Sequence, residues 1–264
     1  MNKGYLIVAN NTSKTNYIEC AEVLAKNIKK VMPESHVSVL TDKMFKSKIF
    51  DKVILLPYGD QDVTGEWKLI NDWQAYEASP YEYTMKIEAD VYLPQSIDFW
   101  WDVLQERDLV ICTRIRNFKQ EISDVRFYRR FIDDNNLPDV YNSLTYFKKS
   151  DLAERFFKIV KDIFENWESY RSELKCPITE KATTDWVYAI ACLILGVEKT
   201  TLKGFDSMSM IHMKQFINGT PTEDWTDKLV YEIAEDYLRI NTIPQLYPFH
   251  YYVKTFHHKL NEKL

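Results

Sequence analysis

Short apolar runs alternate with amphipathic segments along most of this chain. Residues 5–9 form an apolar run typical of a buried strand, and residues 17–31 place apolar side chains at helical spacing. Residues 35–40, 52–56 and 83–88 have the composition and borders of further strands. Strands that alternate with helices favour a parallel sheet with helices on its faces. We therefore predict an α/β fold with a largely parallel central sheet, whose ligands bind beyond the carboxyl ends of the strands.

The rest of the pattern predicts four more helices and two more strands. The helices are expected over 66–78, 96–104, 152–170 and 184–195, and the strands over 108–113 and 141–147. Residues 245–264 have the composition of a basic, aromatic-rich terminal helix or tail. No repeat, low-complexity tract or Gly/Ser linker interrupts the sequence, so we expect a single domain over residues 1–264.

Composition narrows the class of protein. Of the 264 residues 45% are apolar, which is enough for a substantial core. No apolar run approaches the roughly 20 residues that a membrane span requires, and no signal sequence is recognisable, so we expect a cytoplasmic protein. Four widely spaced cysteines without a CxxC pair indicate neither a disulfide framework nor a zinc knuckle.

The net charge of −5 argues against a protein that coats nucleic acid. Two groups of basic residues stand against that background, one between Arg114 and Arg130 and one from Lys254 to the C-terminus. Within the first group, Arg114, Arg116 and Lys119 follow a predicted strand and are candidates to contact a phosphate or a charged acceptor. A solvated basic surface is the alternative.

Two acidic residues stand alone in apolar sequence near residue 90. Glu88 and Asp90 are two positions apart, so on extended backbone their carboxylates point to the same side, at the end of a predicted strand. Two convergent carboxylates form a hard-oxygen site for a divalent cation, which can neutralise a diphosphate leaving group. Solvated acids are the alternative, but the predicted buried strand at 85–87 before them and the apolar residues 91–94 after them favour a functional role.

This segment resembles a known family. The sequence KIEADVYLP, followed by IDFWWDVL, is similar to the Asp-x-Asp region of GT-A glycosyltransferases, especially the glycogenin-like and galactosyltransferase-like family eight. The resemblance implies an α/β fold of the Rossmann-like GT-A type, with a mixed, mostly parallel central sheet flanked by helices. It also implies that Glu88 and Asp90 hold Mn²⁺ and the diphosphate of a nucleotide sugar. Glu replaces the family's first Asp, which favours Asp90 as the direct ligand.

A second element lies more than a hundred residues later. His212 and Lys214 are two positions apart and resemble the family's His-x-Lys element, in which the His is the third metal ligand and the Lys binds the diphosphate. A lone internal His is more often structural, but both elements occur here in the family's order. Carboxylates and an imidazole together suit Mn²⁺ better than Mg²⁺, which is the alternative ion.

Two further segments with a family resemblance lie between these elements. The stretch YNSLTYF at 141–147 resembles the family's Phe-Asn-Ser-Gly segment, which implies that Asn142 contacts the donor sugar. The stretch TTDW at 183–186 resembles the segment whose Asp lies near the reacting centre, which implies a catalytic role for Asp185. A helix N-cap is the alternative for Asp185.

The nucleotide is expected near the N-terminus of the chain. Family members bind base and ribose after their first strand, a place that corresponds here to Ala9, Asn10, Asn11 and Thr12. An ordinary polar loop is the alternative. Lys68 falls on the helix that approaches the nucleotide in the family. The resemblance further implies a UDP-linked donor and retention of the anomeric configuration.

A looser resemblance connects the chain with GT-A proteins of tailed phages, which add arabinose or glucose to 5-hydroxymethylcytosine in DNA. It is carried by residues 66–68, 116–119 and 131–138. It implies a DNA acceptor, basic residues on the phosphates, and expression in the host cytoplasm. Phe118, Phe127 or Tyr128 would then hold an extruded base, with core packing as the alternative for the aromatic residues at 127, 128 and 131.

Other functions remain open from the sequence. The acceptor can equally be a glycan or a protein. A metal-dependent nucleotidyltransferase also uses paired carboxylates, although it often carries a Gly-rich phosphate loop that is missing after residues 5–9 here. The last alternative is a non-catalytic nucleotide-binding module that keeps only the fold.

Overall fold

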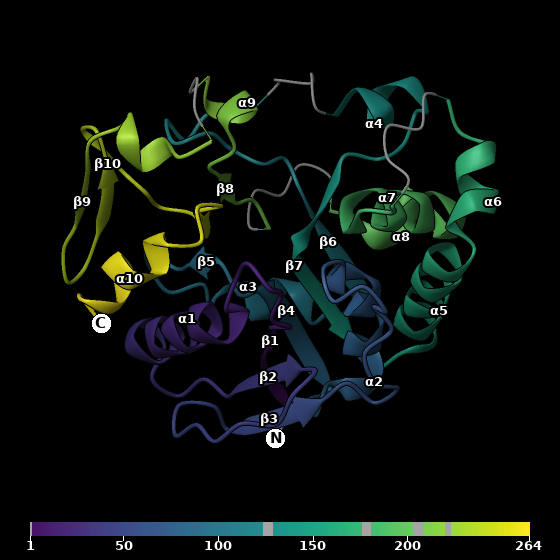
Figure 1. Cartoon of the computed structure of the whole chain (residues 1–264), viewed down its shortest axis with the longest axis horizontal. Coiled ribbons are helices and arrows are strands. Elements are labelled where there is room, and N and C mark those ends of the chain that lie inside the picture. The colour runs from purple at the N-terminus through teal and green to yellow at the C-terminus, as the bar shows by residue number, and fades with distance from the viewer. Residues whose placement is uncertain (1, 124–128, 176–180, 203–207, 220–222) are drawn as a thin grey trace.

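A mixed sheet forms the centre of the protein. The computed structural model describes residues 2–123, 129–175, 181–202, 208–219 and 223–264. Six strands lie in the order β3-β2-β1-β4-β7-β6 (Figure 1). They are β1 (Lys3–Val8), β2 (Val37–Thr41), β3 (Lys52–Leu55), β4 (Tyr83–Glu88), β6 (Leu109–Thr113) and β7 (Val140–Lys148). Because β7 alone runs antiparallel to its neighbours, the predicted mixed, mostly parallel α/β fold is confirmed.

Helices cover both faces of this sheet. One face carries α1 (Tyr17–Val31) and α3 (Trp100–Leu104). The other carries η1 (Lys68–Gln74), α2 (Ala75–Ala78), α5 (Asp151–Glu165) and α7 (Thr184–Leu195). Figure 1 shows α1 and α5 on opposite sides of the central strands. Each face of the sheet packs against its helices in a separate hydrophobic core. Side chains alternate along β1, so Tyr5 and Ile7 pack in the core with α1, and Leu6 packs in the core with α7.

The C-terminal part adds two small sheets beside α1. One is made of β11 (Ile243–Pro244), β10 (Leu238–Ile240) and β9 (Tyr231–Ile233). The other is made of β5 (Val91–Tyr92), β12 (Phe249–His250) and β8 (Ile211–His212). This second sheet joins the segment after β4 to two segments that lie more than a hundred residues later, and α10 (Phe256–Asn261) then packs beside α1 (Figure 1).

Five short elements complete the described part of the chain. They are α4 (Arg130–Asp134), α6 (Trp167–Ser172), α8 (Val197–Thr200), α9 (Gln215–Asn218) and η3 (Trp225–Asp227). None of the helices described here has the length and apolar character needed to cross a membrane.

The predicted boundaries agree with the structure where the pattern is long and regular. The helix over 17–31, the strand over 83–88 and the helix over 184–195 are each observed with the predicted limits.

Four other predicted helices are wrong in part. Residues 68–74 form a 3-10 helix rather than the α-helix expected over 66–78, and the helix expected over 96–104 begins only at Trp100. The helix expected over 152–170 breaks at Asn166, whose φ of −115° and side-chain bonds to Asp162 end α5 before α6 begins. Residues 245–264 form a strand, a turn and a short helix, because Tyr252 has a φ of +60° that no helix accommodates.

A buried ion pair lies behind the end of β4. The Nζ of Lys86 lies 2.8 Å from Oδ1 of Asp72 on η1, and the side chain of Lys86 is only 1% exposed. The other carboxylate oxygen of Asp72 accepts a hydrogen bond from the hydroxyl of Tyr188 on α7. Lys86 also donates to Oδ1 of Asn142 on β7. The sheet and the helices behind it are therefore connected by charge as well as by apolar packing.

Replacing this lysine should destabilise the fold. In Lys86→Met the carboxylate of Asp72 remains buried without its counterion, which is expected to lower the free energy of unfolding by about 3–5 kcal/mol. Lys148→Met is the matched control on the same sheet, because Lys148 pairs with Asp108 at the surface and such pairs contribute at most about 1 kcal/mol. Urea unfolding of both variants measures the difference. Equal losses in the two variants would contradict the assigned role of the buried pair.

Candidate functional site

A cavity of about 430 Å³ opens beyond the carboxyl ends of β1 and β4. Ligands of open α/β sheets bind at this edge. Most of the residues singled out in the sequence line it, although they come from both ends of the chain. They are Asn10, Thr12, Lys68, Glu88, Asp90, Asn142, Asp185, His212 and Lys214. The structure therefore brings together nine side chains that the sequence analysis proposed separately.

Asp90 is the most deeply buried carboxylate of this cavity. Its Oδ2 lies 2.6 Å from Nε2 of His250 on β12 and also accepts a hydrogen bond from Nζ of Lys254. Burial alone would raise the pKa of Asp90, but the neighbouring His250 and Lys254 hold it well below its usual value. Asp90 therefore carries its negative charge throughout the physiological pH range.

Two histidines meet beside this carboxylate. The Nδ1 atoms of His212 and His250 lie 2.6 Å apart, so one ring donates the proton of that hydrogen bond and the other accepts it. Burial, and then the adjacent His250, lower the pKa of His212 well below its usual value. His212 is therefore a neutral imidazole, the form in which histidine binds metals.

The carboxylates of Glu88 and Asp90 and the imidazole of His250 together form a set of ligands that suits a divalent cation. Single ligand atoms of Glu88, Asp90 and His250 all lie within 4.8 Å of one another. This mixture of carboxylate oxygens and an imidazole nitrogen is compatible with Mn²⁺. The sequence analysis expected His212 as the third ligand. In the structure, His250 occupies the position next to the carboxylates, and His212 contacts the far nitrogen of His250.

Glu88 is oriented by the adjacent strand β7. Its two carboxylate oxygens accept hydrogen bonds from Nδ2 of Asn142 at 3.0 Å and from the hydroxyl of Ser143 at 2.6 Å. The carboxylate is about 25% exposed, far more than that of Asp90. Glu88 is thus positioned by neutral donors and keeps access to the cavity.

Asp185 lies in the first turn of α7, with both of its oxygens engaged. Oδ1 accepts the backbone N–H of Asn142 at 2.9 Å, and Oδ2 lies 3.1 Å from the guanidinium of Arg129. Arg129 is itself buried and also pairs with Asp139. The Asp185 side chain accepts no hydrogen bond from the backbone at the start of α7. Asp185 therefore does not act as the N-cap of this helix.

Lysine ammonium groups approach the cavity from the C-terminal side. Lys214 lies 5.5 Å from the ring of Tyr252, and burial lowers its pKa although Asp185 and Glu88 oppose that shift. Lys254 lies 5.6 Å from the same ring. The positive φ of Tyr252 is rare for an aromatic residue, and conformations of this kind occur preferentially at functional sites.

The loop after β1 lines the opposite end of the cavity. The Oδ1 atom of Asn10 is buried and has no hydrogen-bond partner among the described residues. Thr12 also lines the cavity, whereas Ala9 is fully buried beneath it and the Asn11 side chain accepts the backbone N–H of Ile18. Among the described residues of this loop, Asn10 therefore offers a ligand an unsatisfied acceptor, whereas the Thr12 hydroxyl already accepts the backbone N–H groups of Lys14 and Thr15.

Lys68 lines the same end of the cavity. Its Nζ lies 3.1 Å from Oδ2 of Asp42, the residue that follows β2, and it also pairs with Asp60. The sequence analysis placed Lys68 on the helix next to the nucleotide, and the structure places it on the 3-10 helix that borders the cavity.

The basic residues after β6 do not reach the cavity. Arg116 is 8% exposed, donates to Ser209 and to the carbonyl of Gln120, and stacks on Tyr247. This engagement removes it from the candidates for a phosphate contact. Arg114 is half-buried and Lys119 is exposed, and neither lines the cavity.

The described aromatic residues that the sequence offered for base stacking are also buried rather than exposed to a ligand. Phe118 is buried in the core around Trp225, because contacts from the distant C-terminal segment cover it. It therefore cannot hold an extruded base in this conformation. Phe127 and Tyr128 lie outside the described residues, and Phe131 stacks on Trp186 in the core.

His250, Lys254 and Arg129 are site residues that the sequence analysis did not select. Arg129 and Lys254 were noted only as members of basic groups. His250 lies in a two-residue strand, too short to give a periodic pattern. A signal does exist in Phe249, His250 and Tyr251, where a single polar residue interrupts an apolar stretch.

Comparison of sequences finds nothing, since neither a protein-family model nor a curated protein matches this chain. Solved structures do match it. A crystal structure of an active-site mutant of LgtC superposes on 99% of this chain and 96% of that chain, with a TM-score of 0.57 and 12% identity. LgtC in complex with donor and acceptor sugar analogues, described as a galactosyltransferase, aligns over 65% of this chain and 66% of its own, with a TM-score of 0.47 and 11% identity. The apo form of the glycosyltransferase GlyE of Streptococcus pneumoniae TIGR4 covers 77% of this chain and 45% of its own, with a TM-score of 0.45 and 8% identity.

The superposition on LgtC extends over nearly the whole of both chains. The chain has the GT-A fold. The fold expected from the family-eight resemblance is thereby confirmed. Glu88 is the last residue of β4, Asp90 follows it, and the C-terminal segment supplies the imidazole of His250 beside Asp90.

The neutral His212 of this GT-A site should make stability depend on pH. The unfolded chain protonates His212 at about pH 6.5, whereas the folded chain does so only at a much lower pH. Between pH 7 and pH 5 the free energy of unfolding should therefore fall by up to about 1.4 kcal/mol per pH unit from this residue.

Urea unfolding at pH 7, 6 and 5 measures this slope in the wild type and in His212→Asn. The variant should lose this part of the slope, and its near-UV circular dichroism at pH 7 should match that of the wild type. The same slope in both proteins would show that His212 does not cause it.

Proposed function

We propose that this protein is a metal-dependent glycosyltransferase that moves a sugar from a nucleotide sugar to an acceptor hydroxyl. The observation that carries the proposal is the convergence of Glu88, Asp90 and His250 in the strand-end cavity. The GT-A fold supports it, as does the resemblance of residues 86–94 to the acidic segment of family eight. Polar side chains around these three candidate ligands are suited to bind the diphosphate, the nucleoside and the sugar of such a donor.

Glu88, Asp90 and His250 would hold Mn²⁺, with Mg²⁺ as the alternative ion. A bound dication supplies positive charge that stabilises a diphosphate as leaving group. His212 contacts the far nitrogen of His250, and a partner of this kind fixes the orientation of a ligating imidazole. We therefore assign His212 to orienting His250, although the sequence resemblance suggested direct ligation.

Lys214 and Lys254 would bind the diphosphate. Both line the cavity, and fixed positive charges in a partly buried site stabilise an anion more strongly than they do in water. Lys254 forms an ion pair with Asp90. A dication on the carboxylates would take over this role and leave the ammonium group of Lys254 for the phosphate oxygens.

The nucleoside would occupy the end of the cavity formed by Asn10, Thr12 and Lys68. The buried Oδ1 of Asn10 has no partner among the described residues, and an unsatisfied buried acceptor costs about 1–3 kcal/mol. A pyrimidine base with a ring N–H donor, such as uracil, would satisfy it. This supports a UDP-linked donor.

Asn142 and Asp185 would lie at the sugar end of the cavity. Because both oxygens of Asp185 are engaged by Arg129 and by the backbone of Asn142, we assign Asp185 to positioning rather than to proton abstraction. Retention of the anomeric configuration is the outcome that the family-eight resemblance implies, and it belongs to the proposal on that ground.

For the acceptor we favour 5-hydroxymethylcytosine in phage DNA, with arabinosyl or glucosyl transfer. The support comes from residues 66–68, 116–119 and 131–138 of the sequence and from the exposed Lys119 and Arg130. The burial of Arg116 and Phe118 leaves fewer groups for DNA than the sequence suggested. A glycan or protein hydroxyl is the alternative acceptor.

The metal site can be tested by substitution. Asp90→Asn and His250→Asn should each reduce Mn²⁺-dependent release of UDP from a UDP-sugar by about 10²-fold or more, because each removes a group that holds the ion. Asp98→Asn is the matched control, since Asp98 is an exposed acid outside the cavity. Unchanged turnover in both site variants would defeat the proposal. Release of pyrophosphate from a nucleoside triphosphate and a sugar phosphate, without release of UDP from a UDP-sugar, would indicate a nucleotidyltransferase instead.

The acceptor needs a separate experiment. The protein is incubated with Mn²⁺, a mixture of nucleotide sugars and DNA that contains either 5-hydroxymethylcytosine or cytosine, and the nucleosides are analysed by mass spectrometry. The expected product is a pentosyl or hexosyl derivative of 5-hydroxymethylcytosine only. Donor hydrolysis without modified DNA would exclude this acceptor and favour a glycan or protein hydroxyl.

A further inference from the structure

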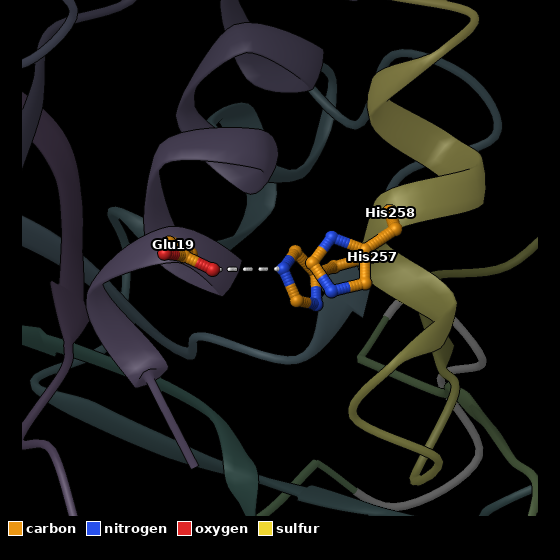
Figure 2. Close-up of side chains that lie close together, drawn as sticks. All are labelled: Glu19, His257 and His258. Carbon is orange, nitrogen blue, oxygen red and sulfur yellow. Dashed lines mark ion pairs between the residues drawn. The ribbon is translucent and has the colours of Figure 1, made fainter.

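A second group of potential metal ligands lies outside the cavity, between the first and last helices. Glu19 extends from the first turn of α1, and His257 and His258 extend from α10. Figure 2 shows the carboxylate of Glu19 directed at the ring of His257, with the ring of His258 alongside. Single ligand atoms of these three residues all lie within 4.8 Å of one another.

The tautomer of His257 is fixed by the backbone. Its Nδ1 lies 2.6 Å from the carbonyl oxygen of Lys254, and a carbonyl only accepts hydrogen bonds, so Nδ1 carries a proton. Histidines that bind metals usually donate one ring N–H to a carbonyl or carboxylate in this way and present the other nitrogen to the ion.

The other nitrogen of His257 faces an acceptor. Its Nε2 is buried, has no hydrogen-bond partner among the described residues, and lies 3.5 Å from Oε2 of Glu19. In the neutral ring this arrangement opposes two lone pairs, which is unfavourable unless a metal cation, or a proton on Nε2, lies between them. The separation is close to the distance of about 3.4 Å between two ligands of a tetrahedral zinc ion with bonds of about 2.0–2.1 Å.

We propose that Glu19, His257 and His258 form a binding site for a divalent transition-metal ion of the zinc class. Two imidazoles and one carboxylate are a ligand set that Zn²⁺ accepts, with water in the remaining position. His258 is exposed, and its ring lies 3.9 Å from the ring of His257, centroid to centroid, so it is placed beside the proposed ion. The site goes beyond the proposed glycosyl transfer and does not depend on it.

The site would attach α10 to α1 next to the strand-end cavity. The two helices are already linked by the hydrogen bond of 2.7 Å from Lys26 to Asn261. The carbonyl that orients His257 belongs to Lys254, whose ammonium group binds Asp90. A metal ion here would therefore fix the segment that brings Lys254 to the cavity.

Zinc titration by calorimetry tests the site. The wild type and Asp90→Asn are used, because the variant weakens the carboxylate site in the cavity and isolates the second site. Asp90→Asn should still bind one equivalent of Zn²⁺, and Zn²⁺ should raise its Tm. Adding Glu19→Gln or His258→Ala should weaken this binding more than about tenfold. Both residues are exposed, so neither substitution threatens the fold.

Glu262→Gln is the matched control, since Glu262 is an exposed acid at the end of α10 outside the cluster, and it should leave Zn²⁺ binding unchanged. If Asp90→Asn proves unstable, Co²⁺ absorption spectra of the wild type and Glu19→Gln replace the titration, and the two spectra should differ. The site is overturned if adding Glu19→Gln or His258→Ala to Asp90→Asn leaves Zn²⁺ binding unchanged, or if Asp90→Asn itself no longer binds Zn²⁺.

The proposed glycosyl transfer is tested separately. Asp90→Asn should lose turnover and still bind Zn²⁺ at Glu19, His257 and His258.

Discussion

The buried charge of Asp90 is the constraint on which the C-terminal third of the structure depends. An ionised carboxylate removed from water costs several kcal/mol unless nearby groups compensate it. Here the compensating groups are His250 and Lys254, which are 160 and 164 residues away in sequence. The chain must return to the end of β4 before that carboxylate can be buried with its charge, so the site and the fold of the C-terminal segment form together.

Apolar packing holds this returning segment in place. Trp225 is fully buried, donates its indole N–H to the carbonyl of Tyr251, and packs edge-on against Phe249 and Phe256. These aromatic side chains bury the large areas that stabilise the small sheet β5-β12-β8 around Asp90. The aromatic richness of residues 245–264 thus belongs mainly to the core.

Local sequence patterns predicted the features that depend on local geometry. The period of the apolar residues gave the limits of α1, β4 and α7, and the two-residue spacing of Glu88 and Asp90 placed their carboxylates at one cavity. His250 could not be found in this way, because its role comes from pairing between β12 and β5. The sequence also did not show that Arg116 is buried and donates a hydrogen bond to Ser209, a residue 93 positions away.

The charges around the cavity explain why paired carboxylates and lysines occur together. Five acidic side chains (Glu66, Asp72, Glu88, Asp90, Asp185) and four basic ones (Lys68, Arg129, Lys214, Lys254) line it, which leaves a formal charge of −1 apart from the histidines. Lys86 behind the cavity neutralises Asp72, so the negative charge is concentrated at Glu88 and Asp90. A bare diphosphate beside these two carboxylates would be repelled, and in a partly buried site that repulsion is poorly screened. A diphosphate that enters with a dication offsets most of its own charge, while the lysines neutralise the remainder. The metal ion of the proposed function would thus offset the charge that an anionic donor brings next to Glu88 and Asp90.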